Sequence, residues 1–243
     1  MPRRDRRYVV TKLAKDVPPG PQGQPGHKAG TEVVHITAVD VEGLGGASFA
    51  TPRPSELLLH EAKSELARAV RLRSQCLRQT SRPKWTQPGI KHRLTNDQLV
   101  FDFFGAAMAG VVQAYAAVDA RLNEFFTEPV LHKGQSVPVE QVQGFWSADR
   151  KLDYVANSSG MGWINDEGLG DEIDDLKELR DMIVHIRTDL IRSRHPDFPR
   201  DGGERLLWHR LLNDSDLERY GRLAERLLDG LRQPTPIGDD QSG

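Results

Sequence analysis

The stretch from Asp97 to Thr127 limits the fold more than any other part of this sequence. Its apolar residues are so dense that a helix formed from it must be buried on several sides. Thr95 or Asn96 can cap the start of this helix, and Pro129 ends it. The apolar residues are Leu99, Phe101, Phe103, Phe104, Met108, Val111, Val112, Tyr115, Val118, Leu122, Phe125 and Phe126. We therefore expect this helix at the centre of a bundle.

Helical periodicity predicts four further helices around the central one. They are expected at about residues 55–77, 139–156, 172–193 and 204–231. The helix expected at residues 172–193 carries leucine and isoleucine at alternating steps of three and four. This stripe is typical of a helix that packs against another helix. The last can be interrupted near Asn213. The predicted fold class is therefore all-α, an up-and-down bundle of about five helices over residues 55–233.

The first 54 residues differ from the rest of the chain. Residues 8–11 and 32–39 are rich in β-branched side chains and resemble strands, and a Pro- and Gly-rich linker separates them. We expect residues 1–54 to form an irregular or β-containing extension, either a strand pair or a partly disordered arm. Residues 234–243 are expected to be a disordered tail.

Charge and cysteine content exclude several classes of protein. The net charge of −2 argues against a general polyanion binder, so nucleic acid must be bound by a local patch. The single cysteine, Cys76, excludes an internal disulfide. Only three apolar residues follow the basic start, too few for a signal peptide, and no apolar run approaches a membrane span. We expect a cytoplasmic protein with no cofactor, metal or membrane contact.

Familiar catalytic motifs are missing from the sequence. It has no Gly-rich phosphate loop ending in Lys-Ser/Thr, no dinucleotide-binding glycine pattern, no His-Glu-x-x-His and no Gly-x-Ser-x-Gly. The eight histidines are scattered, without the spacing of metal ligands. Most of the motifs that would identify a nucleotide hydrolase, dehydrogenase, metalloprotease or serine hydrolase are therefore absent from the sequence.

The helix expected at residues 172–193 offers the best candidate for chemistry. Arg180 is a permanent cation, and His185 offers an imidazole that can act as a base. Five residues separate them by about 140° of helical rotation. Asp181 lies four residues before His185, where it can orient the imidazole or hold Arg180. Such a trio suits metal-independent RNA cleavage, in which His185 deprotonates a ribose 2′-hydroxyl and Arg180 stabilises charge on the phosphate.

Plainer interpretations of the same residues stay open. Arg180 can be a solvated helix residue paired with Glu178 or Asp181. His185, flanked by Val184 and Ile186, can be a half-buried packing residue. Chance pairs of Arg and His at such spacings are expected in a chain this rich in arginine.

Residues 176–186 resemble the signature of the HEPN superfamily (higher eukaryotes and prokaryotes nucleotide-binding). That signature is an Arg, usually followed by a polar residue, and a short spacer to a His within an apolar helix. Residues 114–125 are similar to the long helix that these domains place earlier, and residues 151–155 resemble the helix before the signature. The resemblance covers about residues 97–231 in element order.

This resemblance implies a dimeric helical bundle and, in many members, a metal-independent endoribonuclease of defence or toxin–antitoxin systems. Arg180 and His185 would take the catalytic positions, and Asp181 the polar position after the Arg. Arg187 stands where toxins regulated by a nucleotidyltransferase antitoxin have a Tyr, which weighs against that form of regulation. The implied partners are RNA, a second copy and an antitoxin or regulatory protein. The alternative is a non-catalytic helical module that binds a protein partner or a nucleotide, since some members do not cleave.

Five residues are candidates for contacts with RNA. Asn123 can face the catalytic cleft, although a polar helix end is an equal reading. Lys84, Trp85 and Arg93 belong to a basic loop in which the indole can stack on a base, or can instead anchor the loop on the bundle. Arg187 follows the signature and completes the set.

Overall fold

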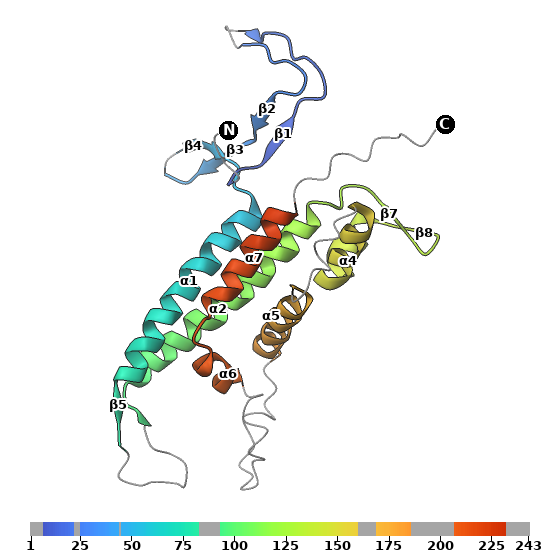
Figure 1. The fold of residues 1–243 in the computed structure, drawn as a ribbon. Coiled ribbons are helices and arrows are strands. Elements are labelled where there is room, and N and C mark those ends of the chain that lie inside the picture. The colour runs from blue at the N-terminus through green and yellow to red at the C-terminus, as the bar shows by residue number, and fades with distance from the viewer. Residues whose placement is uncertain are drawn as a thin grey trace. The chain divides into compact units, whose positions relative to one another are not determined.

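The fold is seen in a computed structural model, which describes residues 7–21, 25–43, 45–82, 93–159, 169–185 and 207–231. Seven helices account for 59% of the described residues. Four two-stranded antiparallel sheets accompany them (Figure 1). The predicted all-α bundle of about five helices is therefore wrong, because the arrangement is a mixed α/β one. The helices are α1 (Pro54–Arg78), α2 (Asp97–Asn123), α3 (Val139–Phe145), α4 (Ala148–Ser159), α5 (Leu169–Val184), α6 (Leu207–Asn213) and α7 (Glu218–Gly230).

The strands form four local ladders. They are β1 (Val10–Lys12) with β2 (Glu32–Val34), β3 (Ile36–Val41) with β4 (Gly45–Ala50), β5 (Thr80–Ser81) with β6 (Arg93–Leu94), and β7 (Val130–His132) with β8 (Gln135–Val137). The chain divides into two compact units, Met1–Leu57 and Leu58–Gly243, which are described separately. The tail predicted at 234–243 lies outside the described residues.

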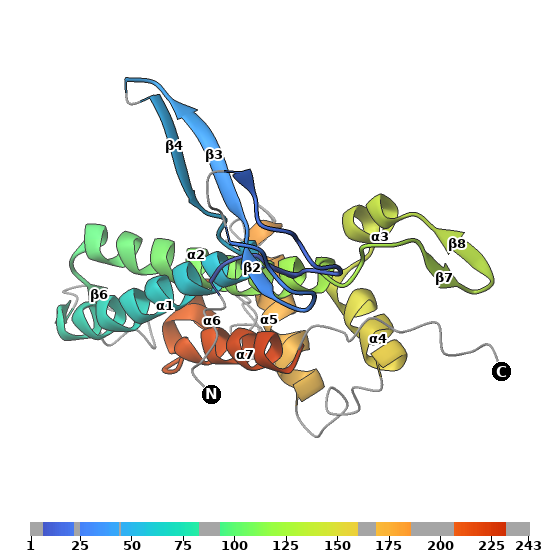
Figure 2. The same ribbon diagram turned by 90° about the horizontal axis from the view of Figure 1, so that it is seen from above.

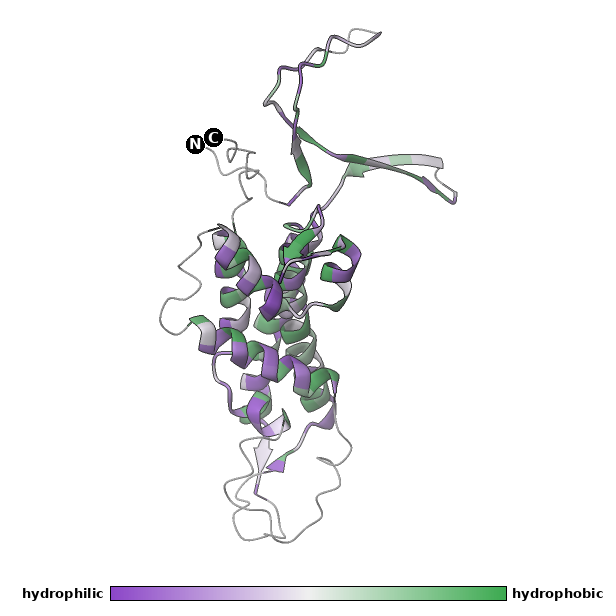
Figure 3. Ribbon diagram, turned by 90° about the vertical axis from the view of Figure 1, so that its right-hand side faces the viewer, coloured by the Kyte–Doolittle hydropathy of each residue, from purple (hydrophilic) through white to green (hydrophobic). Residues whose placement is uncertain are grey.

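Helix α2 is the centre of the second unit, as its apolar density predicts. It contacts α4, α5, α6 and α7, and α1 and α7 run beside it (Figure 1). Asn96 caps it, since its Oδ1 accepts a hydrogen bond of 3.0 Å from the backbone N–H of Leu99. Hydrophobic and hydrophilic residues alternate along the surrounding helices (Figure 3), as they do in amphipathic helices that pack one face on a core. Helix α2 is also long and apolar enough to cross a membrane, a property that core helices of soluble proteins share.

Two predicted helices are interrupted. The helix expected at 139–156 breaks into α3 and α4 at Trp146, whose backbone is extended and whose indole packs on Phe126 and Tyr154. The last helix breaks between α6 and α7, where the Asp214 carboxylate accepts a hydrogen bond of 2.9 Å from the backbone N–H of Asp216. This break lies at the interruption expected near Asn213.

The segment between α2 and α3 is an unpredicted hairpin. Strands β7 and β8 are joined by Lys133 and Gly134, which have φ values of 50° and 77°. Positive φ at both central residues is the geometry of the tight turn that suits the twist of paired strands. The second of the two positions favours glycine, which has no Cβ to clash.

In the first unit, two short ladders and an isolated bridge meet at a ring of backbone hydrogen bonds. The N–H of His35 donates to Val9 over 2.9 Å, that of Val9 to Thr51 over 2.9 Å, and that of Thr51 to His35 over 2.8 Å. Ladders β1–β2 and β3–β4 extend from this ring, and Tyr8 bridges Pro52 beside it. Ser55 is the only buried residue among those described in this unit, so the ladders form without a core of their own.

Candidate active site

Helix α5 carries the predicted catalytic segment and lies against α2. Its buried residues Leu176, Leu179 and Ile183 follow the predicted stripe. The remaining stripe positions, Ile186 and Leu190, are outside the described residues. The opposite side of the segment is exposed at Asp171, Asp174, Glu178 and His185.

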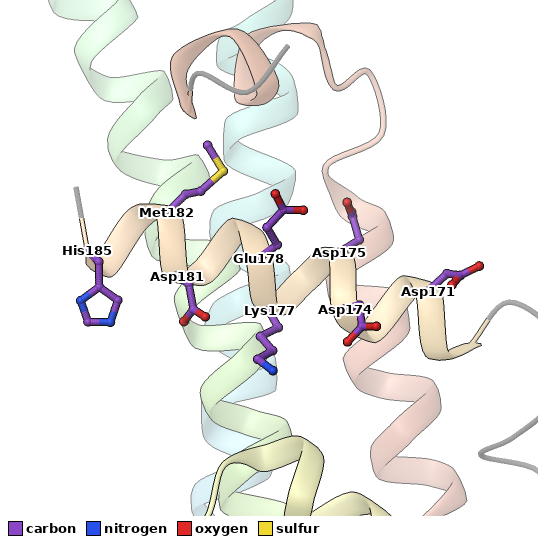
Figure 4. Close-up of a pocket in the computed structure, with 8 residues that line it drawn as sticks. All are labelled: Asp171, Asp174, Asp175, Lys177, Glu178, Asp181, Met182 and His185. Carbon is purple, nitrogen blue, oxygen red and sulfur yellow. The ribbon is translucent and has the colours of Figure 1, made fainter. Parts of the chain in front are cut away.

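His185 is exposed and lines an open pocket of about 760 Å³. Its backbone N–H donates to the carbonyl of Asp181 over 2.9 Å, so helical geometry holds to this residue. The described residues that line the pocket are Asp171, Asp174, Asp175, Lys177, Glu178, Asp181, Met182 and His185 (Figure 4). The half-buried packing role considered for His185 therefore does not fit, since its imidazole faces solvent.

Arg180 lies elsewhere on the same helix. Its guanidinium donates to the Asp181 carboxylate over 2.6 Å and stacks over the Tyr115 ring of α2, 5.0 Å from the ring centroid. Arg180 is not among the described pocket residues, so within this part of one chain the guanidinium and the imidazole do not meet. The pairing with Asp181 is one of the two, with Glu178 or with Asp181, that the plainer interpretation of Arg180 offered.

Asp181 connects the two candidate groups. It binds Arg180 and also lines the pocket, where it projects from the same side of α5 as Lys177 and His185 (Figure 4). The Arg180 guanidinium itself is turned towards α2, over the Tyr115 ring.

The pocket is acidic. Five carboxylates line it against one ammonium group, that of Lys177. Asp175 is neutralised by Arg210 and Arg219 and also accepts a hydrogen bond of 2.8 Å from Tyr220. A hydrogen bond from Lys177 to Asp149 of α4 raises the pKa of that ammonium. The carboxylates include no group of three residues placed to hold a metal ion, within the chain described. A phosphodiester entering this pocket would need cations from outside it.

A polar seam, which sequence reasoning missed, runs between α2 and its neighbours. Burial, with a contribution from Asp149, raises the pKa of the Tyr115 hydroxyl, so the ring under Arg180 is a neutral phenol. One turn along α2, Asp119 binds the ammonium of Lys151 over 2.7 Å. The sequence signal was the spacing of four residues between Tyr115 and Asp119, two polar groups on one face of an apolar helix.

Two of the five predicted RNA-contact residues, Asn123 and Arg93, are described by the structure, and neither is among the described residues that line this pocket. Asn123 lies at the end of α2, and its Oδ1 is buried without a hydrogen-bond partner among the described groups. Arg93 is exposed in β6, opposite Ser81. Lys84, Trp85 and Arg187 lie outside the described residues. Comparison of the chain with protein-family models, with curated proteins and with solved structures finds no match.

Proposed function

We propose that this chain is a HEPN-like, metal-independent endoribonuclease that acts as a homodimer in the cytoplasm, in a defence or toxin–antitoxin setting. The observation that carries the proposal is the exposed imidazole of His185, beside a carboxylate that also holds Arg180. Metal-independent RNA cleavage requires a base that is open to solvent and a permanent cation near it. His185 is such a base, and the cation Arg180 is bound by the Asp181 carboxylate of the same pocket.

In the proposed reaction His185 accepts the proton of a ribose 2′-hydroxyl. The O2′–phosphorus bond forms as the phosphorus–O5′ bond breaks, and the departing O5′ takes up a proton from water. The products are a 2′,3′-cyclic phosphate and a 5′-hydroxyl. Arg180, swung from the Tyr115 ring, stabilises the charge on the phosphate. Because the pocket of one chain is acidic, a second copy across a two-fold axis supplies the further cations.

Cleavage of single-stranded RNA in EDTA tests the proposal. Wild-type protein is expected to cleave and to leave cyclic phosphate ends. His185→Ala is expected to lower the rate by about 10²–10⁴-fold, the usual contribution of a general base. Arg180→Ala should lower it as well, whereas Arg180→Lys should retain part of the activity because the charge stays.

The matched controls lie away from the pocket. His209 is an exposed histidine of α6 and Arg226 an exposed arginine of α7, and neither lines this pocket. His209→Ala and Arg226→Ala should cleave like the wild type. Activity that survives in His185→Ala with the helical circular dichroism unchanged would refute the catalytic role of His185.

A second candidate is a non-catalytic module that binds a basic protein segment. The five carboxylates of the pocket favour it, and they favour a Lys- or Arg-rich peptide over a nucleotide, whose phosphates they would repel. In this case the wild type cleaves no RNA with or without EDTA, and it binds a poly-lysine peptide in a salt-dependent manner. Asp171→Asn with Asp174→Asn should then weaken that binding.

A further inference from the structure

The guanidinium of Arg180 rests against one aromatic ring. Helices α4 and α5 both contact α2 (Figure 2), and Arg180 reaches from α5 to Tyr115 of α2, with its Cζ atom 5.0 Å from the ring centroid. At this separation the negative face of the ring attracts the cation. The Arg180 side chain is 33% exposed, so water weakens only part of this attraction. Tyr115 therefore helps to decide where the guanidinium lies.

This position is at the edge of the candidate pocket. Arg180 Nη1 donates a hydrogen bond of 2.6 Å to Oδ1 of Asp181, and Asp181 lines the pocket together with His185. The guanidinium is thus one hydrogen bond away from a lining side chain, although Arg180 is not among the described lining residues. The proposed reaction needs this cation on the phosphate. The contact with the Tyr115 ring therefore competes with the contact that catalysis requires.

The surroundings of the ring retain a cation. Tyr115 lies in the polar seam, where the carboxylates of Asp149, Asp119 and Asp181 act on its hydroxyl. Burial and the Asp149 carboxylate raise the pKa of that hydroxyl, so the ring is uncharged at neutral pH. The Oδ1 atom of Asp149 is buried without a hydrogen-bond partner among the described groups. A neutral ring with carboxylates around it is an environment that stabilises a guanidinium.

We propose that Tyr115 is a positioning residue of the candidate site, whose ring holds Arg180 in a resting position beside the pocket. The inference rests on the proposed function, because it assigns Arg180 to a phosphate in the pocket. The ring lowers the fraction of molecules in which the cation is ready to act, since the guanidinium must first leave it. Loss of the ring therefore raises the rate of cleavage. Loss of an ordinary packing residue lowers stability and does not raise this rate.

Single-turnover cleavage of single-stranded RNA in EDTA tests the proposal. Tyr115→Leu is expected to raise the rate about two- to tenfold, the factor that matches a partly exposed cation–π contact. Tyr115→Phe keeps the ring and should stay near the wild-type rate. Tyr154→Leu is the matched control, because Tyr154 is also partly buried and packs on Trp146, with no cation–π contact among the described residues. Tyr154→Leu should not exceed the wild-type rate.

A double variant shows whether the effect passes through Arg180. In the Arg180→Ala background there is no guanidinium to release, so Tyr115→Leu should bring no further gain. A gain in that background would show that the smaller side chain acts in another way, for example by widening the pocket. That result would overturn the positioning role.

NMR of arginine side chains measures the contact without any cleavage. The ring current of Tyr115 should move the Arg180 Nε–H proton upfield of that of Arg226, an exposed arginine of α7. The shift should disappear in Tyr115→Leu and persist in Tyr115→Phe, and a proton that does not respond would refute the contact. If the wild type cleaves RNA and Tyr115→Leu is no faster, the positioning role alone is refuted. If the proton responds and neither protein cleaves RNA, the proposed function fails and the positioning role fails with it.

Discussion

Asp119→Ala is expected to destabilise the helical unit by about 3 kcal/mol. The Lys151 side chain is 1% exposed, and its ammonium is held by the Asp119 carboxylate at 2.7 Å and by the Gln143 carbonyl at 3.0 Å. Removal of the carboxylate leaves a buried cation without a counter-charge. Asp119 itself is 34% exposed, so water can replace part of the lost interaction, and we expect the lower end of the usual range. Urea unfolding followed by circular dichroism measures the loss.

A double-mutant cycle separates the attraction between Asp119 and Lys151 from the free-energy cost of burying the Lys151 charge. Replacing a buried ion pair by apolar groups of similar size is often neutral, so Asp119→Ala with Lys151→Met should be more stable than Asp119→Ala alone. The exposed pair of Lys63 and Glu225, at 2.9 Å and 47% exposure for each side chain, is the matched control. Glu225→Ala should cost less than about 1 kcal/mol. Equal losses for Asp119→Ala and Glu225→Ala would show that burial of Lys151 is not the cause.

Local signals in the sequence were enough to place most of the helices. Asn96 indicated where α2 begins. The dense apolar run indicated its central position, because a helix that is apolar on all sides has to be buried. The stripe of Leu176, Leu179 and Ile183 gave the buried side of α5. In both cases the information lies within a few turns of one helix.

The break at Trp146 and the β7–β8 hairpin depend on features that helical periodicity does not encode. Trp146 ends α3 because its indole packs on Phe126 and Tyr154, residues from other elements. The β7–β8 hairpin depends on one two-residue turn at Lys133 and Gly134, too short to show in a periodicity. These elements account for most of the difference between the predicted all-α bundle and the mixed fold.

The candidate site was predictable in its residues and not in its arrangement. The exposure of His185 follows from helix geometry, since it lies about 200° from the buried Ile183. The position of Arg180 does not, because the guanidinium is held by Tyr115, sixty-five residues earlier in the chain and brought near by packing of α2 on α5. The acidity of the pocket, in contrast, can be read from the sequence, because all five carboxylates that line it lie on α5.

Gly110→Ala is expected to destabilise the protein by about 1–3 kcal/mol, although alanine favours helices. A Cβ at this position would lie 2.6 Å from Leu66 Cγ and 3.0 Å from the Leu66 backbone nitrogen of α1. The side chain of Leu66 can rotate, but the backbone nitrogen moves only if the two helices separate. Differential scanning calorimetry should show a lower melting temperature with native helical content.

Gly105 of the same helix provides the opposite case. No atom lies within 4 Å of its added Cβ, so Gly105→Ala should stabilise the protein by about 0.5–1 kcal/mol through helix propensity alone. If Gly110→Ala matched Gly105→Ala in stability, the spacing of α1 and α2 would not be set by this glycine. A clear difference in sign would identify Gly110 as the residue that lets the two longest helices approach closely enough to exclude water from the core.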